Sequence, residues 1–218
     1  MVRRMKDAEF KASQLAHQSD PHIAPINAFV DQLTDPNGRG WLPKVAPLHG
    51  GVDAKVLSVL SDPGKATLDG GGSGFLCIEN NDATAEAQCK LFDAHEISPR
   101  WVLPWNAYPW FIDRAPNAEE KNAGAEVLCE LIDLIPALKV VLLQGGSAVD
   151  VWKRVVKLRP AMVADRGLVV IESIHPSRQA QWTPDLAERQ ARLDKQQRAF
   201  ETVARVVNGE KTQFPLVE

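Results

Sequence analysis

Four hydrophobic runs in this chain each end in a polar, turn-forming tip. The tips are Ser61-Asp62-Pro63-Gly64, Asn106-Ala107-Tyr108-Pro109, Gly145-Gly146-Ser147 and His175-Pro176-Ser177. The loops that follow the strands of a parallel α/β sheet open on one edge, and ligands bind at that edge. We therefore expect an Asp, an Asn and a His to converge on one pocket, beside a glycine turn able to hold a phosphate. The order of the tips predicts an active site.

The runs alternate with segments of helical pattern. Strands are expected at 55–60, 100–105, 139–143 and 167–174, and helices at 25–33, 82–95, 118–135, after 145, and at 183–208. In the helix expected at 82–95, Ala85, Gln88, Leu91 and Phe92 stand at helical spacing. Strands that alternate with helices imply parallel pairing with right-handed crossovers.

The length of 218 residues fits one globular domain with its own hydrophobic core. We expect a single three-layer α/β domain, with a central, mostly parallel four-stranded sheet flanked by helices, over residues 46–218. Residues 1–45 are expected to form an N-terminal leader that begins as a helical or weakly ordered segment.

Composition leaves the function open. A hydrophobic fraction of 44% and a charged fraction of 24% suit an enzyme and a binding module equally. A formal net charge of −3 argues against nucleic-acid binding by bulk electrostatics, although it permits a local basic face. Such a face is one interpretation of the basic residues that follow His175, and a solvated helix surface is the other; these residues are Arg178, Arg189, Arg192, Lys195 and Arg198.

Residues 1–20 lack the apolar core of a signal peptide, and no later run is long enough to span a bilayer. We therefore expect a cytoplasmic protein without a membrane partner. Cys77, Cys89 and Cys129 are an odd number and lack Cys-x-x-Cys spacing. Three buried thiols are expected, rather than a disulfide framework or a metal site, and no cofactor is implied.

The tips together resemble a known family. Leu60-Ser61-Asp62-Pro63-Gly64, Asn106 at a strand end, Gly146-Ser147 before a helix and His175-Pro176-Ser177 resemble the ordered motifs of the uracil-DNA glycosylase superfamily, over about residues 46–182. Each motif alone is weak, but their order and placement make the combination fairly specific. The resemblance implies that a uracil flipped out of DNA enters the pocket and that its N-glycosidic bond is hydrolysed.

The resemblance also implies roles for the tip residues. Asp62 corresponds to the acid that orients water and stabilises the sugar cation, and His175 to the donor that bonds the uracil carbonyl as negative charge builds there. Asn106 can offer a donor and an acceptor to one base edge. Each residue also has a purely structural interpretation. Asp62 is then a turn residue before Pro63, His175 is a histidine that hydrogen-bonds to backbone at a strand end, and Asn106 forms an Asx turn.

Further residues are expected around these three. By resemblance, Phe75 stacks on the flipped base, with Ser61 and Gly64 beside it, although a lone Phe is more often part of a core.

The backbone of Gly146 and Ser147 is expected to hold a DNA phosphate, with Ser177 and Arg178 as further contacts. Gln179 stands where relatives often carry an apolar wedge. Lys65 stands where the best-known branch has an aromatic residue that excludes thymine, so strict uracil selectivity does not follow.

The sequence thus predicts a monomeric, monofunctional DNA glycosylase that removes uracil or a related modified base from DNA. No lysine is clearly placed as a nucleophile, so water is the expected attacking group. One alternative is a non-enzymatic member of the same fold that only binds the base. Another is a small-molecule nucleotide-processing enzyme that uses the Gly145 turn, although the Gly-x-Gly-x-x-Gly fingerprint of such enzymes is absent from the first strand turn.

Overall fold

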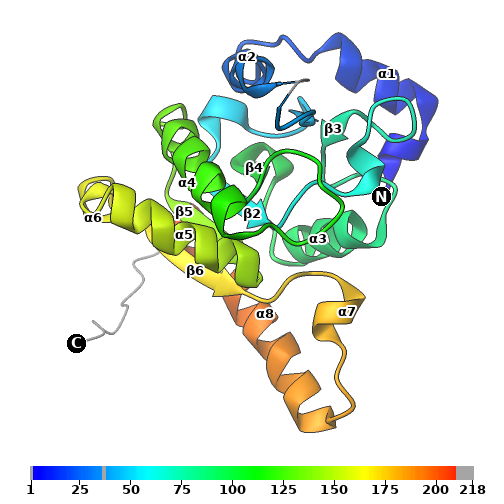
Figure 1. The fold of residues 1–218 in the computed structure, drawn as a ribbon. Coiled ribbons are helices and arrows are strands. Elements are labelled where there is room, and N and C mark those ends of the chain that lie inside the picture. The colour runs from blue at the N-terminus through cyan, green and yellow to red at the C-terminus, as the bar shows by residue number, and fades with distance from the viewer. Residues whose placement is uncertain (1, 36–37, 210–218) are drawn as a thin grey trace.

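A four-stranded parallel sheet forms the middle layer of the protein in the computed structural model, which describes residues 2–35 and 38–209 (Figure 1). In spatial order its strands are β4 (Val102–Asn106), β2 (Val56–Leu60), β5 (Val140–Gln144) and β6 (Val169–Ser173). All three pairings are parallel, and Leu60 stands opposite Asn106 while Gln144 stands opposite Ser173. The carboxyl ends of the strands therefore meet at one edge, and the predicted α/β class with a four-stranded sheet is confirmed.

The sequences of the strands are nearly continuous apolar runs because helices cover both faces of the sheet. Alternate side chains enter different cores: Leu57 and Val59 pack in a cluster with α4 and α5, whereas Val56 and Leu142 pack in a cluster with α3 and α8. The helices that cover the two faces are α4 (Ala118–Asp133) and α5 (Gly146–Leu158) on one, and α3 (Ala83–Ala94) and α8 (Leu186–Val207) on the other. Helix, sheet and helix make the three layers.

Polar caps set where the helices begin. The carboxylate of Asp82 accepts the N–H groups of Thr84 and Ala85 at the start of α3. Asn117 and Glu120 form a reciprocal capping box at the start of α4, which ends at Asp133, two residues before the expected end. The last helix begins after Asp185 rather than at Thr183, because the Asp185 carboxylate accepts the first free N–H groups.

One glycine lets a helix lie directly on the loop that follows β4. A Cβ atom added to Gly124 of α4 would stand 1.8 Å from the carbonyl oxygen of Ala107, the residue after Asn106. No side chain fits in that space, so the backbone of α4 supports the tip of β4.

The N-terminal segment is helical and lies against a second, two-stranded sheet that the sequence did not indicate. Helices α1 (Ala8–Ala16) and α2 (Ala24–Leu33) are followed by β1 (Lys44–Val45), which pairs in parallel with β3 (Phe75–Leu76). The side chain of Asn27 in α2 donates to the carbonyl of Val45 and accepts its N–H. The backbone of Met5 donates to the carbonyl of Glu79, so both ends of this segment contact the main body.

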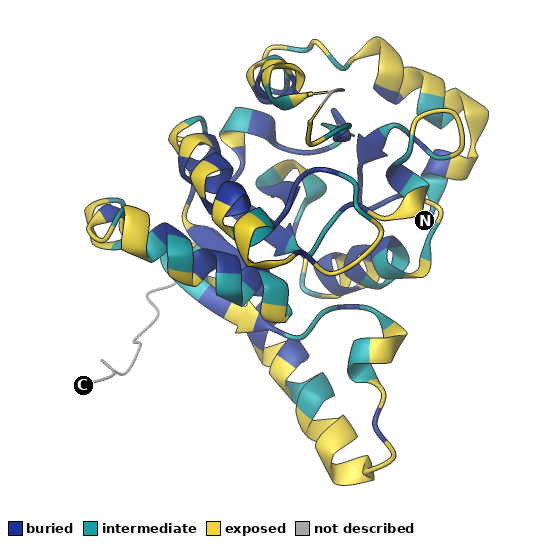
Figure 2. Ribbon diagram, viewed as in Figure 1, coloured by how far each residue is buried: buried dark blue, intermediate teal, exposed yellow. Residues whose placement is uncertain are grey.

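One stretch of the C-terminal region, from α7 (Arg178–Gln181) into the first half of the last helix, α8, extends away from the sheet. After the short helices α6 (Met162–Asp165) and α7, the first half of α8 is exposed while its second half packs on β5 and β6 (Figures 1 and 2). The described helices include none that is both long enough and apolar enough to cross a bilayer.

Candidate active site

A cleft of about 470 Å³ opens at the carboxyl edge of the sheet. Its lining includes five of the residues that the sequence singles out, namely Ser61, Asp62, Gly64, Asn106 and His175. They come from the ends of three strands, β2, β4 and β6. The structure therefore brings the carboxylate, the amide and the imidazole together on one cleft.

Backbone bonds hold two of these tips side by side. The N–H of Ala107 donates to the carbonyl of Leu60 over 2.8 Å, and the N–H of Tyr108 donates to the carbonyl of Ser61 over 3.0 Å. The ladder between β2 and β4 thus continues past the ends of the strands. Asp62 and Asn106 are placed by the same pair of strands.

The ring of His175 is oriented by the turn that follows it. The backbone N–H of Ser177 points to Nδ1 of His175 at 3.1 Å, so Nδ1 acts as the acceptor and the neutral ring carries its proton on Nε2. Burial lowers the pKa of His175 below its ordinary value, which favours the neutral ring. The imidazole is therefore set up to donate one hydrogen bond from Nε2 without a positive charge.

The carboxyl of Asp62 is half-buried and lines the same cleft. Burial raises its pKa above the ordinary value, the nearby side chain of Ser61 opposes that shift, and the negative charge of Asp113 adds to it. Asp113 itself forms an ion pair of 2.8 Å with Lys65 at the rim of the cleft. Such a carboxylate can accept a proton from water or face a developing cation.

The amide of Asn106 is buried, with 2% of the residue exposed. Its Nδ2 has no hydrogen-bond partner among the residues that the structure describes. Leaving a buried amide donor unpaired costs about 1–3 kcal/mol, so this group is available to a ligand or a water molecule.

The glycine turn lies against the histidine. Gly145 has φ of 97° and precedes α5, and a Cβ at this position would stand 3.2 Å from Cβ of His175. Ser147, in the first turn of α5, accepts a hydrogen bond of 3.1 Å from the hydroxyl of Ser61. The turn expected to hold a phosphate thus adjoins the tips of β2 and β6.

Phe75 does not line the cleft, which corrects the expectation that it forms the stacking wall. Its neighbours Leu76 and Cys77 line the cleft, whereas Phe75 packs with Met5 and Ala46 and lines a separate cavity. Successive side chains of a strand point to opposite sides, and the ring of Phe75 takes the side that faces the N-terminal segment.

Two buried amides that sequence reasoning did not select also line the cleft. Asn80 precedes α3 and Gln88 lies in its second turn, with 2% and 3% of each residue exposed. Gln88 stands in the same helical stripe as the apolar Ala85, Leu91 and Phe92. A polar residue in an otherwise apolar stripe is the signal that points to it.

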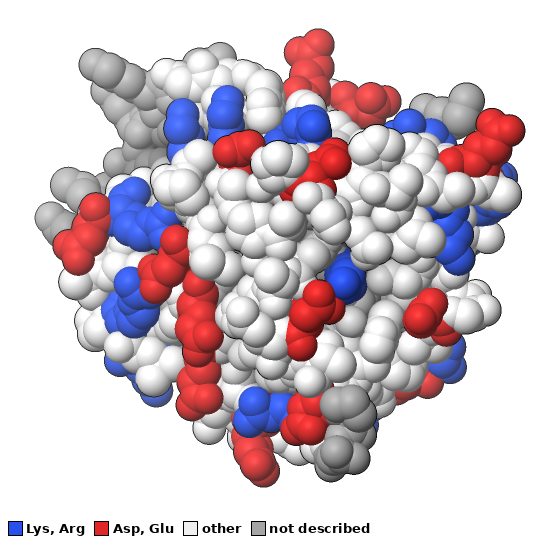
Figure 3. All heavy atoms as spheres, turned by 90° about the horizontal axis from the view of Figure 1, so that it is seen from above, with Lys and Arg blue, Asp and Glu red and all other residues white. Residues whose placement is uncertain are grey.

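A hollow of about 570 Å³ lies beyond His175 along the chain. It is lined by Arg178, Gln179, Gln181, Trp182 and Arg189, and the side chain of Trp182 is largely exposed. Ser177 caps α7 through its hydroxyl, which accepts the N–H of Ala180. The face of the molecule seen in Figure 3 interleaves acidic and basic side chains.

The chain matches no protein-family model, and no curated protein matches it.

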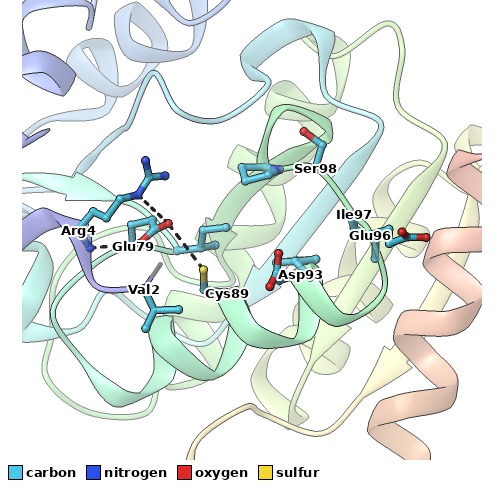
Figure 4. A pocket seen from close by; sticks show the side chains of 11 residues that line it. Val2, Arg4, Glu79, Cys89, Asp93, Glu96, Ile97 and Ser98 are labelled. Atoms are coloured by element: carbon cyan, nitrogen blue, oxygen red, sulfur yellow. Dashed lines mark hydrogen bonds and ion pairs between the residues drawn. The ribbon is translucent and has the colours of Figure 1, made fainter.

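Another cavity, of about 540 Å³, lies where the N-terminal segment meets α3 (Figure 4). Arg4 reaches into it and pairs with the buried carboxylate of Glu79 over 3.0 Å, and Sγ of Cys89 contacts the same carboxylate. Cys77, Cys89 and Cys129 are all buried free thiols. Burial raises the pKa of Cys77 to about 12 and that of Cys89 to about 11, so these thiols are protonated and unreactive at neutral pH.

Proposed function

We propose that this protein is a cytoplasmic, monofunctional DNA glycosylase that removes uracil or a related modified base, flipped out of DNA, as the resemblance to the uracil-DNA glycosylase superfamily suggests. The observation that carries the proposal is the convergence of Asp62, Asn106 and His175 on one cleft at the carboxyl edge of the sheet. This arrangement supplies the two kinds of charge stabilisation that glycosidic hydrolysis needs.

In the proposed reaction, the N-glycosidic bond breaks and its electron pair stays with the base. The departing base gains negative charge, which the Nε2–H of neutral His175 stabilises by a hydrogen bond. The deoxyribose gains positive charge, which the Asp62 carboxylate faces. A water molecule then adds to the sugar carbon and passes a proton to the carboxylate. Asp62 releases this proton to solvent and the base anion takes one up, so the products are the free base and an abasic site.

Other residues hold the substrate in this proposal. Asn106 hydrogen-bonds the base through its unpaired amide group. The backbone of Gly146 and Ser147 and the side chains of Ser177 and Arg178 contact phosphates beside the flipped nucleotide. The hollow formed by Arg178, Trp182 and Arg189 suits DNA next to it, because an exposed aromatic ring stacks on any base and arginines attract the backbone.

Gly64 leaves room beside the base. A Cβ added to it would meet nothing within 4 Å, and the neighbouring Lys65 is held in an ion pair with Asp113. This supports a pocket that accepts bases larger than uracil.

The experiment is incubation with single- and double-stranded oligonucleotides that carry one uracil or one modified base, followed by alkaline cleavage at abasic sites. Excision that is lost in His175→Ala, with binding to abasic DNA retained, supports the proposal, because His175 is assigned to the transition state. Binding of base-containing DNA without excision would instead identify a non-enzymatic base reader. Absence of both would favour a small-molecule enzyme.

A further inference from the structure

Three buried polar atoms lie between the sheet and α8, on residues that are not part of the cleft lining. They are Oε1 of Gln144, Oγ of Ser173 and Nε2 of Gln196, and none has a hydrogen-bond partner within residues 2–35 and 38–209. At most 4% of each residue is exposed. Buried polar groups are almost always paired, so these atoms indicate a partner that the described chain does not itself supply.

The strand register places the three atoms at one level of the fold. Gln144 and Ser173 end neighbouring strands and are direct partners in the ladder between β5 and β6. They follow Leu142 and Ile171 by two positions, so their side chains point to the same face, which α8 covers. Gln196 is the first buried residue of α8, and the chain reaches α8 from the carboxyl edge, where both strands end.

The other polar atoms of these side chains define what the unpaired ones need. Nε2 of Gln144 donates to the hydroxyl of Ser58 over 2.8 Å, so its free Oε1 is an acceptor. Oε1 of Gln196 accepts from Nε2 of Gln181 over 3.1 Å, so its free Nε2 is a donor. The hydroxyl of Ser173 can take either part. One water molecule satisfies this set with about three hydrogen bonds, the number typical of buried water.

We propose that Gln196 is a positioning residue, which fixes the ends of β5 and β6 through one buried water molecule shared with Gln144 and Ser173. Both strand ends lead directly into turns of the candidate site. Gln144 directly precedes Gly145, and Ser173 stands two residues before His175. The N–H of Gly145 also donates to the carbonyl of Ser173 over 3.0 Å. A group that fixes Ser173 therefore fixes the glycine turn and the histidine turn together.

The imidazole is sensitive to this placement. The N–H of Ser177 points to Nδ1 of His175 at 3.1 Å, and that contact selects the ring tautomer protonated at Nε2. A shift at Ser173 would move the histidine turn and weaken the selection. Gln181, which holds the amide of Gln196, lines the hollow on α7 and α8, so the positioning chain runs from that hollow to the ring. The inference concerns the ring and stands without the proposed reaction.

The direct test is a crystal structure of the full chain, at a resolution that shows ordered water. We expect one water molecule within hydrogen-bond distance of Oε1 of Gln144, Oγ of Ser173 and Nε2 of Gln196. Direct hydrogen bonds among these three atoms, or the lack of a water molecule that they share, would overturn the proposal.

The positioning role is tested by nitrogen-15 NMR of the histidine rings, which reports the tautomer. The chain has five histidines, and the signals of His175 are those missing from His175→Ala. Gln196→Met keeps the size of the side chain, removes the donor, and should lower the fraction of His175 protonated at Nε2. Ser173→Ala should do the same. The two changes together should add little to either alone, because both remove partners of one water molecule.

Val203→Ala is the control for a loss of packing alone. Val203 is fully buried on α8 two turns beyond Gln196, where it packs on the apolar part of the sheet. Its truncation should lower the unfolding temperature and leave the tautomer of His175 as in the wild type. An unchanged tautomer in Gln196→Met and Ser173→Ala, purely additive effects of the two, or the same change in Val203→Ala would each overturn the proposal.

Excision separates this inference from the proposed function. If the protein excises a base, Gln196→Met should lower kcat by about tenfold or more with KM near the wild-type value, because a misplaced ring stabilises the transition state less. A wild-type tautomer and kcat in Gln196→Met would overturn the inference and leave the glycosylase proposal intact. A changed tautomer in a protein that excises no base would uphold the inference and contradict the proposed function.

Discussion

The backbone N–H of Ser177 points to Nδ1 of His175 at 3.1 Å. A ring that accepts at Nδ1 must donate from Nε2, and a doubly protonated ring would bring two donors face to face. The turn His175-Pro176-Ser177 therefore opposes protonation of the imidazole, in the same direction as its burial.

The pH dependence of excision should follow from this tautomer. The proposed reaction needs neutral His175, whose pKa is lowered, and ionised Asp62, whose pKa is raised. The kcat/KM should rise with pH through an acid limb below the ordinary His value and stay level around neutrality. Measuring kcat/KM between about pH 4 and 9 checks this. A rate that increases towards acid pH would show that the charged imidazolium is the active form.

Asp62→Asn should separate stability from activity. Because burial raises the pKa of Asp62, the folded state disfavours its ionised form, so stability is lost as pH rises through the ordinary value towards the folded one. The neutral amide removes that penalty and should raise the unfolding temperature at neutral pH. Excision should fall about 10²-fold or more, as for removal of an electrostatic stabiliser.

The control for this prediction is Asp113→Asn, which removes an exposed carboxylate at the rim of the cleft. It should leave excision far closer to the wild-type rate. If Asp62→Asn excises the base at the wild-type rate, another residue activates the water.

DNA affinity should depend on salt, with a shallow slope. The proposed contacts neutralise only a few phosphates, because Arg178 and Arg189 are the basic residues of the hollow. Trp182→Ala should weaken binding of single-stranded DNA without changing the slope, whereas Arg178→Ala should reduce the slope and weaken all sequences equally. Fluorescence anisotropy at several salt concentrations measures the DNA affinity and its salt slope.

Leu186→Ala, at an exposed apolar position outside the hollow, is the control. A change in which base is excised by Arg178→Ala would instead assign Arg178 to the base or the wedge.

The N-terminal segment should stabilise the wall of the cleft. Arg4 contacts the carboxylate of Glu79 through both its side chain and its backbone N–H, and Glu79 directly precedes Asn80. Arg4→Met leaves a buried carboxylate without its cation and should cost about 1–3 kcal/mol in the free energy of unfolding. Urea denaturation measures the loss. Arg3→Met, whose partner Glu86 is more exposed, should cost less, and equal losses would contradict a special role for the Glu79 pair.

The sequence predicts the main sheet and the meeting of its tips because the strands are apolar runs bounded by turns, and because parallel strands share an edge. It does not predict the pairing of β1 with β3, since two-residue strands carry no periodic signal. For the same reason, the sequence does not predict which side of β3 the side chain of Phe75 faces. The side that a residue of such a strand faces depends on which part of the chain covers the strand. Here the ring of Phe75 packs with Met5, which lies 70 positions earlier in the sequence.

The sequence also does not predict that Asn80 and Gln88 line the cleft. Gln88 lines the cleft because of how α3 is rotated over the sheet, and that rotation depends on its packing against α8, whereas Asn80 lines it from the loop before α3. Gln88 could be noticed as a polar residue in an apolar stripe. Asn80, in a polar turn with Asn81 and Asp82, gives no such signal.

The contact between Gly124 and Ala107 makes the amide of the cleft sensitive to a residue that lies outside it. Any side chain at position 124 must push α4 away from the loop after β4, because backbone fills that space. Asn106 directly precedes that loop. Substitution of Gly124 would therefore shift the amide of Asn106 while leaving every residue of the cleft unchanged, so loss of the proposed activity there would reflect a misplaced amide rather than missing chemistry.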